Sequence, residues 1–189
     1  DLEPRFVEEQ TQHLIARLRN GNLDLAVLAL PSEATGMVDS PLYTEDFAIV
    51  SPPDHPIAGR EDVELAELKD LDLLLLDDGH CLRDQVVDLC RHANINPAEA
   101  TNSVTRASSL TTIMQLVMGG LGCTLVPESA LATECHGKDV AIAHFASDVT
   151  AEREVGLVFR SSAARAEEFR EFGTLITSAY NKAIERSRQ

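Results

Sequence analysis

Hydrophobic residues recur along the chain in two alternating rhythms, one helical and one extended. Residues 5–19 carry apolar side chains at helical spacing, and the polar stretch 20–22 ends that pattern. Residues 23–30 form an almost continuous apolar run, which is typical of a strand covered on both faces. Later segments alternate in the same way, with strands expected at 42–51, 71–76, 123–126 and 155–159 and helices at 65–68, 80–92, 108–118 and 163–186. This alternation predicts an α/β fold with mainly parallel strands.

Neither a linker nor a membrane segment interrupts this pattern. No repeat and no glycine/serine-rich stretch divides the chain, so two lobes would have to be joined by strands that cross between them. The longest apolar runs, 23–30 and 71–76, each contain an aspartate and fall well short of the roughly 18–20 residues that span a bilayer. We therefore expect no membrane-spanning helix.

The net charge of the chain argues against some classes of binding partner. With 189 residues, of which 44% are hydrophobic and 25% charged, the chain has the composition of a globular protein with a sizeable core. Its formal net charge of −15 repels phosphate groups, so this chain alone is a poor candidate for binding nucleic acid or an anionic membrane. Asp1 stands inside what looks like a helix or loop, and we expect the chain to be a piece of a longer protein.

The four cysteines are Cys81, Cys90, Cys123 and Cys135, too few for a disulfide scaffold and without a C-x-x-C pair. Reduced thiols in a cytoplasmic protein are the expectation, and a disulfide there would be transient. Cys123 is expected to be structural in a buried strand, and Cys135 to be an inert surface or loop thiol. A metal site built from these cysteines and nearby histidines matches no standard zinc spacing, so neither a metal nor a cofactor is expected.

Several longer motifs carry a family resemblance. The runs GNLDLAVLALP (21–31), LYTEDFAIVSPPDHP (42–56) and MGGLGCTLVPESAL (118–131) resemble the effector-binding domain of LysR-type transcription regulators. The run LLLLDDGHCLRDQVVDLC (73–90) is similar to the peroxide-sensing members of that family, in which a Gly-His-Cys-Leu-Arg-Asp-Gln motif is followed nine positions later by a second cysteine.

The resemblance implies a fold and a domain organisation. It implies two Rossmann-like lobes joined by two crossing strands, as in periplasmic binding proteins, with an effector cleft between them. Residues 1–44 plus 152–189 would form lobe I, and residues 45–151 would form lobe II with the redox cysteines. It also implies an N-terminal winged-helix DNA-binding domain and a first effector-domain strand with a pocket threonine, neither of which matches any residue of this chain.

Cys81 has the setting that a reactive thiol needs. It lies at the start of a predicted helix, where free N–H groups and the helix dipole favour a thiolate, and His80 and Arg83 could add positive charge. A thiolate attacks peroxide and becomes a sulfenic acid, which a second thiol condenses into a disulfide. Cys90 is the natural second thiol, although its place beside Leu89 also suits a core position.

The spacing of these two cysteines constrains the chemistry. Nine helical residues rise about 13.5 Å and turn about 900°, which places the second cysteine on the opposite face. A disulfide requires Cα atoms within about 4.4–6.8 Å of each other. If both thiols react, the helix must therefore unwind, and this remodelling would act as the switch.

Further site residues come from the resemblance alone. Thr11 resembles the threonine at the start of the cleft helix, whose hydroxyl can hydrogen-bond peroxide or its water. His80, Asp84 and Gln85 belong to the Cys81 motif. Arg153 stands where the family has a basic residue near the hinge, and it could hold a thiolate or polarise a leaving oxygen.

Simpler interpretations remain open for three of these residues. Thr11 could be only the N-cap of a helix that begins at the next position. His80 could be an ordinary polar residue at a helix start. Arg153 could be a solvated ion-pair partner of its neighbours Glu152 and Glu154.

The leading hypothesis is a hydrogen peroxide sensor, not an enzyme, that regulates transcription through the DNA-binding domain outside this chain. Homodimers or homotetramers, a cellular thiol reductant and RNA polymerase are the further expected partners. Oxidation would alter the oligomer geometry and DNA binding. One alternative is an effector domain that binds a small organic ligand, with bystander cysteines; another is a thiol peroxidase, although the Pro-x-x-x-Thr-x-x-Cys surroundings of peroxiredoxins are absent from the sequence.

Overall fold

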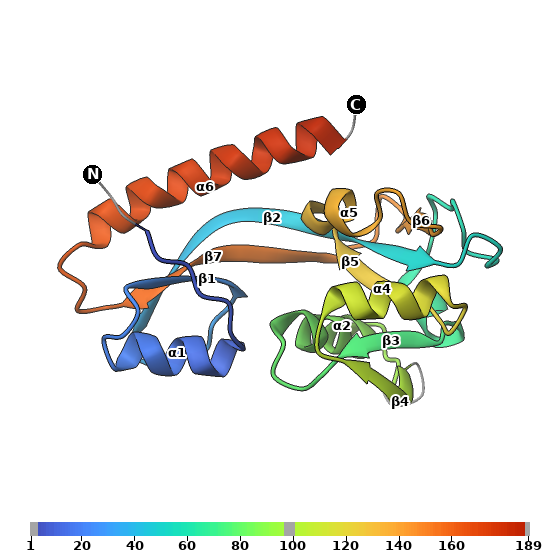
Figure 1. Ribbon diagram of the computed structural model, residues 1–189, viewed down its shortest axis with the longest axis horizontal. Coiled ribbons are helices and arrows are strands. Elements are labelled where there is room, and N and C mark those ends of the chain that lie inside the picture. The colour runs from blue at the N-terminus through green and yellow to red at the C-terminus, as the bar shows by residue number, and fades with distance from the viewer. Residues whose placement is uncertain (1–3, 97–100, 188–189) are drawn as a thin grey trace.

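The computed structural model describes residues 4–96 and 101–187, in which helices and strands alternate (Figure 1). The strands are β1 (Leu25–Leu30), β2 (Met37–Ser51), β3 (Leu73–Leu76), β4 (Thr101–Ala107), β5 (Thr124–Pro127), β6 (Ala141–His144) and β7 (Glu152–Arg160). The helices are α1 (Thr11–Arg19), the 3-10 helix η1 (Leu65–Asp70), α2 (Cys81–His92), α4 (Leu110–Met118), α5 (Glu128–Glu134) and α6 (Ala166–Ser187).

One long strand runs through both halves of the molecule. β2 pairs with β7 over residues 37–46 and then with β5 and β6 over residues 47–51, so its partners change within one strand. The larger sheet has the order β1-β7-β2-β5, with β6 also on β2, while β3 and β4 form a separate pair. The expected α/β class, with two halves joined by crossing strands, is confirmed.

The expectation of mainly parallel strands is wrong for the described residues. β1 and β2 are both antiparallel to β7, and β2 is also antiparallel to β5 and β6; among the paired strands, β3 and β4 run parallel. The apolar runs arise because both faces of the sheet are covered. Val158 packs in a cluster with α1, whereas Leu157 and Phe159 pack with Phe169 of α6. Burial on both faces therefore explains the runs without fixing the strand direction.

Several element boundaries also differ from expectation. α1 begins at Thr11, so the expected helix from residue 5 loses its first six residues. β2 begins at Met37 and contains Pro41, and it is correspondingly longer than expected. β4, α5 and β6 were not expected, because β4 is largely polar in sequence and the other two are short.

The second half of the molecule has its own core on both sides of β3. In one cluster, residues of α2, η1 and β5 pack around Leu68, Leu73 and Cys90. In the other, residues of α4 pack against Leu74 and Leu76. The four residues of β3 are all buried, and alternate ones belong to different clusters. β3 therefore anchors the turn that leads into α2.

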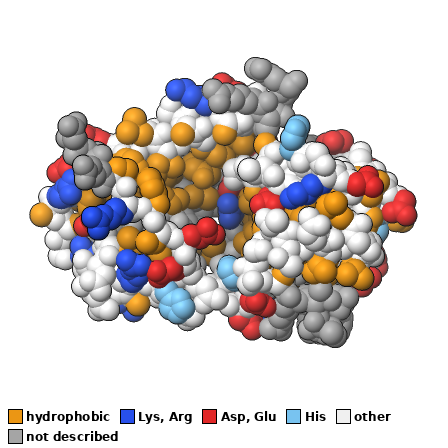
Figure 2. All heavy atoms as spheres, viewed as in Figure 1, with side chains coloured by type: hydrophobic (Ala, Val, Ile, Leu, Met, Phe, Trp, Pro, Cys, Tyr) orange, Lys and Arg blue, Asp and Glu red, His pale blue; other side chains and the backbone are white. Residues whose placement is uncertain are grey.

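The part of the molecule that contains β1 and α6 exposes several hydrophobic side chains. Figure 2 shows hydrophobic side chains gathered over the strands beneath α6, with charged side chains bordering this patch. Val27 on β1 and Leu175 on α6 are among the exposed large hydrophobic residues. Among the helices that the structure describes, none is both long and apolar enough to cross a membrane.

Candidate functional site

Cys81 is the first residue of α2 and is half-buried. The N-cap is His80, whose backbone is extended (φ −89°, ψ 123°) and whose side chain makes no capping hydrogen bond. The backbone N–H groups of Arg83 and Asp84 both donate to the His80 carbonyl, which closes the first turn. A helix start directs its remaining N–H groups and positive dipole end towards nearby side chains, and these groups stabilise negative charge. Cys81 thus occupies the helix-start position that the sequence predicted.

Arg83 folds back over the turn that precedes this helix. Its Nη2 lies 2.8 Å from the Asp78 carboxylate and its Nη1 lies 3.6 Å from Asp84. The side chain is 21% exposed, and its Nε is buried with no hydrogen-bond partner among the described atoms. Arg83 therefore ties the first turn of α2 to the loop before it, and it retains one donor for another acceptor.

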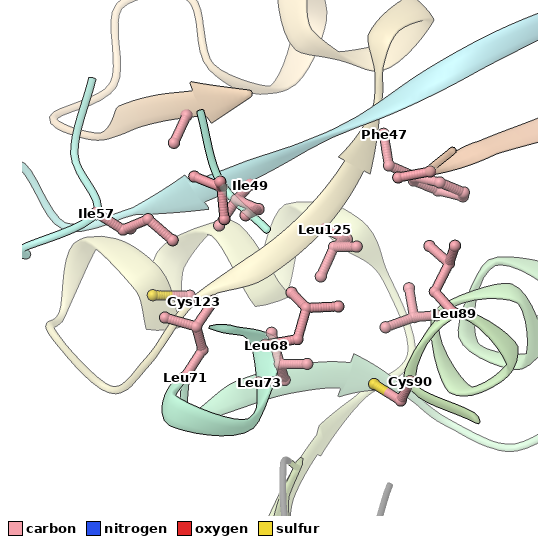
Figure 3. Close-up of a cluster of buried hydrophobic side chains, with 14 of the residues drawn as sticks. Phe47, Ile49, Ile57, Leu68, Leu71, Leu73, Leu89, Cys90, Cys123 and Leu125 are labelled. Atoms are coloured by element: carbon pink, nitrogen blue, oxygen red, sulfur yellow. The ribbon is translucent and has the colours of Figure 1, made fainter. Parts of the chain in front are cut away.

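Cys90 lies on the other side of α2, inside the core. Figure 3 shows it with Leu89 at the edge of the hydrophobic cluster that contains Leu68 and Leu73. Its side chain is fully buried, and α2 is continuous from Cys81 to His92. The helix that separates the two thiols is thus intact, and all four cysteines are free. The sequence expectation that the pair cannot bond in this conformation is confirmed by the unbroken helix.

The start of α1 reaches across to the start of α2. Gln10, the N-cap residue of α1, donates from Nε2 to the Asp78 carbonyl at 3.3 Å. Gly79 has a φ of +93°, which favours glycine, and a Cβ there would lie 3.1 Å from Gln10 Oε1, so the glutamine side chain would have to shift slightly. Thr11 follows Gln10 directly and is the first helical residue. The interpretation of Thr11 as an N-cap is therefore wrong. The N-terminal end of α1, which carries Thr11, contacts the turn that precedes Cys81.

Arg153 joins α2 to a buried acid on β2. Its Nε and Nη2 lie 2.8 Å and 2.6 Å from Glu45 Oε1, and its Nη1 lies 3.5 Å from Gln85 Oε1. The other Glu45 oxygen accepts from the backbone N–H of Ser129 at 2.9 Å. The interpretation of Arg153 as a partner of its exposed sequence neighbours is wrong, because its carboxylate partner is Glu45.

Burial disfavours ionisation of Cys90, Cys123 and Cys135. Burial raises the pKa of Cys90 and of Cys135, and it raises the pKa of Cys123 to about 11, with a smaller contribution from Asp72. Cys135 lies in the turn that follows α5, as one form of the expectation had it, but it is 9% exposed, so its placement at the surface is wrong. The buried position of Cys123 is confirmed. Cys81 is the one cysteine that reaches solvent to an intermediate degree.

Two candidate features were missed by sequence reasoning. Glu45 precedes the apolar run of β2, and nothing in that local pattern distinguishes it from an exposed acid. Gln10 adjoins Thr11, yet its contact with the Asp78 turn joins segments 68 positions apart. Of the expected residues, the structure groups His80, Arg83, Asp84 and Gln85 on the first turns of α2, with Arg153 beside Gln85.

Two surface hollows are lined by residues away from the Cys81 turn. One, of about 620 Å³, is lined by η1, the end of α2 and residues 148–150. Another, of about 460 Å³, is lined by acidic residues of β2 and by the end of α6 around Tyr180. Within the described ranges, no group of three histidine, cysteine, aspartate or glutamate side chains could hold a metal ion.

Comparison with known proteins gives consistent matches. Residues 1–180 match the family described as the LysR substrate binding domain. A probable hydrogen peroxide-inducible genes activator of Mycobacterium avium is 49% identical over 172 residues, covering 91% of this chain and 54% of that protein. The chain thus spans about half the length of such relatives.

Solved structures of OxyR from Corynebacterium glutamicum match the whole fold at 60% identity. A cysteine-to-serine mutant with hydrogen peroxide bound superimposes with a TM-score of 0.95, covering 98% of this chain and 57% of that chain. The oxidised form superimposes with a TM-score of 0.86, covering 100% of this chain and 58% of that chain. At equal identity, the fold here is closer to the peroxide-bound mutant than to the oxidised form.

The raised pKa of Cys123 makes the stability fall at high pH. In the unfolded chain this thiol ionises near pH 9, whereas the folded chain keeps it protonated up to about pH 11. The free energy of unfolding should therefore decrease as the pH rises through that window, by roughly 2 kcal/mol for this thiol. Urea unfolding at pH 8, 9, 10 and 11 measures it.

The matched comparison is Cys123→Ala. This variant should be less stable than the parent at pH 8 because it leaves a small cavity, but its decline with pH should be shallower than that of the parent. Cys90, Cys135 and the tyrosines continue to titrate in both proteins. An identical decline in parent and variant would contradict the assignment.

Proposed function

The chain belongs to the LysR substrate-binding domain family, in its OxyR-type branch, and we propose from this premise that it senses hydrogen peroxide through Cys81. The observation that carries the proposal is the arrangement of α2. One half-buried thiol begins this helix, a second lies in the core near its end, and the helix between them is intact. Relatives of this chain are described as probable hydrogen peroxide-inducible genes activators, which supports the same chemistry.

The proposed reaction has two steps. The Cys81 thiolate attacks one peroxide oxygen, so a sulfur–oxygen bond forms while the O–O bond breaks and the second oxygen leaves as hydroxide, which takes up a proton to become water. Sulfur is oxidised by two electrons and peroxide is reduced. The Cys90 thiol then attacks the sulfenic sulfur, and a disulfide forms with release of a second water. A cellular thiol reductant returns both residues to thiols.

The neighbouring residues have distinct proposed roles. Thr11 would hydrogen-bond peroxide or its water from the facing end of α1. His80, Arg83 and Asp84 shape the first turn and its charge, and Gln85 lies next to Arg153. We propose that Arg153 stabilises the developing charge on the leaving oxygen, since a preorganised donor in a sheltered site acts most strongly there.

Formation of the disulfide would remodel α2. Val86, Leu89 and Cys90 are buried against the core in the reduced chain. Exposing an apolar side chain of this size costs about 1.5–3 kcal/mol, so the reduced conformation is held by several such contacts. Bringing Cys90 to Cys81 therefore requires local unwinding, and the resulting change of surface would constitute the signal.

The regulator as a whole is also a proposal. Residues 1–44 and 152–189 would form one regulatory lobe and residues 45–151 the other, a division that the change of partners along β2 near residue 46 supports. Homodimers or homotetramers would carry winged-helix domains that bind DNA, and oxidation would alter their spacing and the contact with RNA polymerase. The cytoplasm is the proposed location, since these partners act there.

The first test separates the roles of the two thiols. The reduced chain, treated with about one equivalent of peroxide, should yield a Cys81–Cys90 crosslink in non-reducing peptide mass spectrometry. Cys81→Ser should consume no peroxide, while Cys90→Ser should accumulate the sulfenic acid without a disulfide. Cys135→Ser is the matched control and should behave as the parent. Thiols that stay free, or that all oxidise slowly and alike, would favour the small-ligand alternative.

A second test concerns the unwinding step. Asp88 is exposed on α2 and pairs with Arg91 at 2.8 Å, so Asp88→Ala and Asp88→Gly lose the same contact. Glycine destabilises a helix interior by about 1 kcal/mol relative to alanine, so the glycine variant should form the disulfide about fivefold faster. The sulfenic acid should form at equal rates in both, as measured by quenched-flow trapping. Equal disulfide rates would contradict an unwinding step.

A further inference from the structure

Glu45 is an almost fully buried acid on β2, and its carboxylate contacts Arg153, the residue proposed to act on the leaving peroxide oxygen. The residue is 2% exposed, and its carboxylate is shared between the Arg153 guanidinium and the Ser129 backbone N–H. We infer that Glu45 is the positioning residue that fixes Arg153 for the reaction of Cys81 with peroxide. This inference rests on the proposed function and adds to it a residue that no motif in the sequence identified.

The hydrogen bonds determine how the guanidinium is oriented. Nε and Nη2 of Arg153 both donate to Oε1 of Glu45, so one edge of the planar group is occupied. The remaining nitrogen, Nη1, is then directed towards Gln85 at 3.5 Å, one turn of α2 beyond Cys81. That separation is at the long limit of a hydrogen bond, so Nη1 remains able to donate to a closer acceptor.

Ser129 holds the acid in turn. Its N–H binds the second carboxylate oxygen, so both oxygens of Glu45 are engaged and the carboxylate cannot rotate freely. The side chain of Arg153 is 17% exposed and that of Glu45 is 0% exposed. A buried charge that loses its partner is strongly disfavoured, which keeps Arg153 at this position rather than at its exposed acidic neighbours.

Charge and position make opposite predictions for this pair. Glu45 offsets the positive charge of Arg153. Removal of the Glu45 charge leaves that positive charge uncompensated, which should favour the Cys81 thiolate. If Glu45 acted only through charge, its loss would speed the reaction of Cys81 with any electrophile. If it positions Arg153, its loss misdirects the donor to the leaving peroxide oxygen, and only the peroxide reaction slows.

The experiment measures two rates on the reduced 189-residue chain. Sulfenic acid formation by hydrogen peroxide reports on the leaving oxygen, and alkylation by iodoacetamide at the same pH reports on the thiolate alone. For Glu45→Gln we expect about a tenfold slower peroxide reaction, with alkylation unchanged or faster. Glu154→Gln, an exposed acid next to Arg153, is the matched control and should leave both rates unchanged.

A variant cycle tests whether Glu45 acts through Arg153. In an Arg153→Gln background, adding Glu45→Gln should change the peroxide rate less than twofold, because the donor it would position is already absent. If Glu45→Gln does not fold, Glu45→Asp keeps the buried charge but shortens its reach, and it should still slow the peroxide reaction selectively.

The outcomes separate the inference from its premise. A parent chain that does not react with peroxide overturns the proposed function and the inference with it. A reactive parent whose Glu45→Gln variant reacts at the parental rate overturns the inference alone. An equal loss in both reactions assigns Glu45 a structural role and also overturns it.

Discussion

An intact helix between two thiols is the constraint on which the proposed switch depends. Cys81 and Cys90 occupy opposite ends and faces of α2, and about 13.5 Å of helical rise separates them. No side-chain rotation bridges that distance, so oxidation can proceed to a disulfide only by changing the backbone. In the proposed switch, the reaction and the conformational change are therefore coupled by geometry.

The two ends of α2 are stabilised by different kinds of contact. Polar contacts hold its start, where Arg83 pairs with Asp78 and Gln10 binds the same turn from α1. Apolar contacts hold its end, where Cys90 is buried and burial raises its thiol pKa. A reactive thiol needs the first environment and a protected reserve thiol needs the second. The length of one helix separates these environments, and this separation is what lets the proposal assign detection and switching to the same segment.

Local sequence patterns predicted α2 better than the long-range contacts around the site. α2 was expected within one residue of its observed start, because a turn, a helix-start motif and an apolar stripe are all local signals. The pairing of Glu45 with Arg153 joins residues 108 positions apart, and no periodicity reports such a contact. Strand direction was missed for a similar reason, since burial on both faces looks the same in parallel and antiparallel sheets. The cap of α1 was missed because the Gln10 side chain makes no capping hydrogen bond and donates instead to the Asp78 carbonyl, 68 positions away.

Hydrogen exchange of the α2 backbone amides tests the central claim most directly. The amides of residues 85–92 would be followed by mass spectrometry in the reduced chain, in peroxide-treated Cys90→Ser and in the disulfide form. The account predicts strong protection in the first two states, because the sulfenic acid alone leaves the helix intact, and loss of protection once the disulfide forms. Unchanged protection in a chain with a verified Cys81–Cys90 disulfide would contradict it.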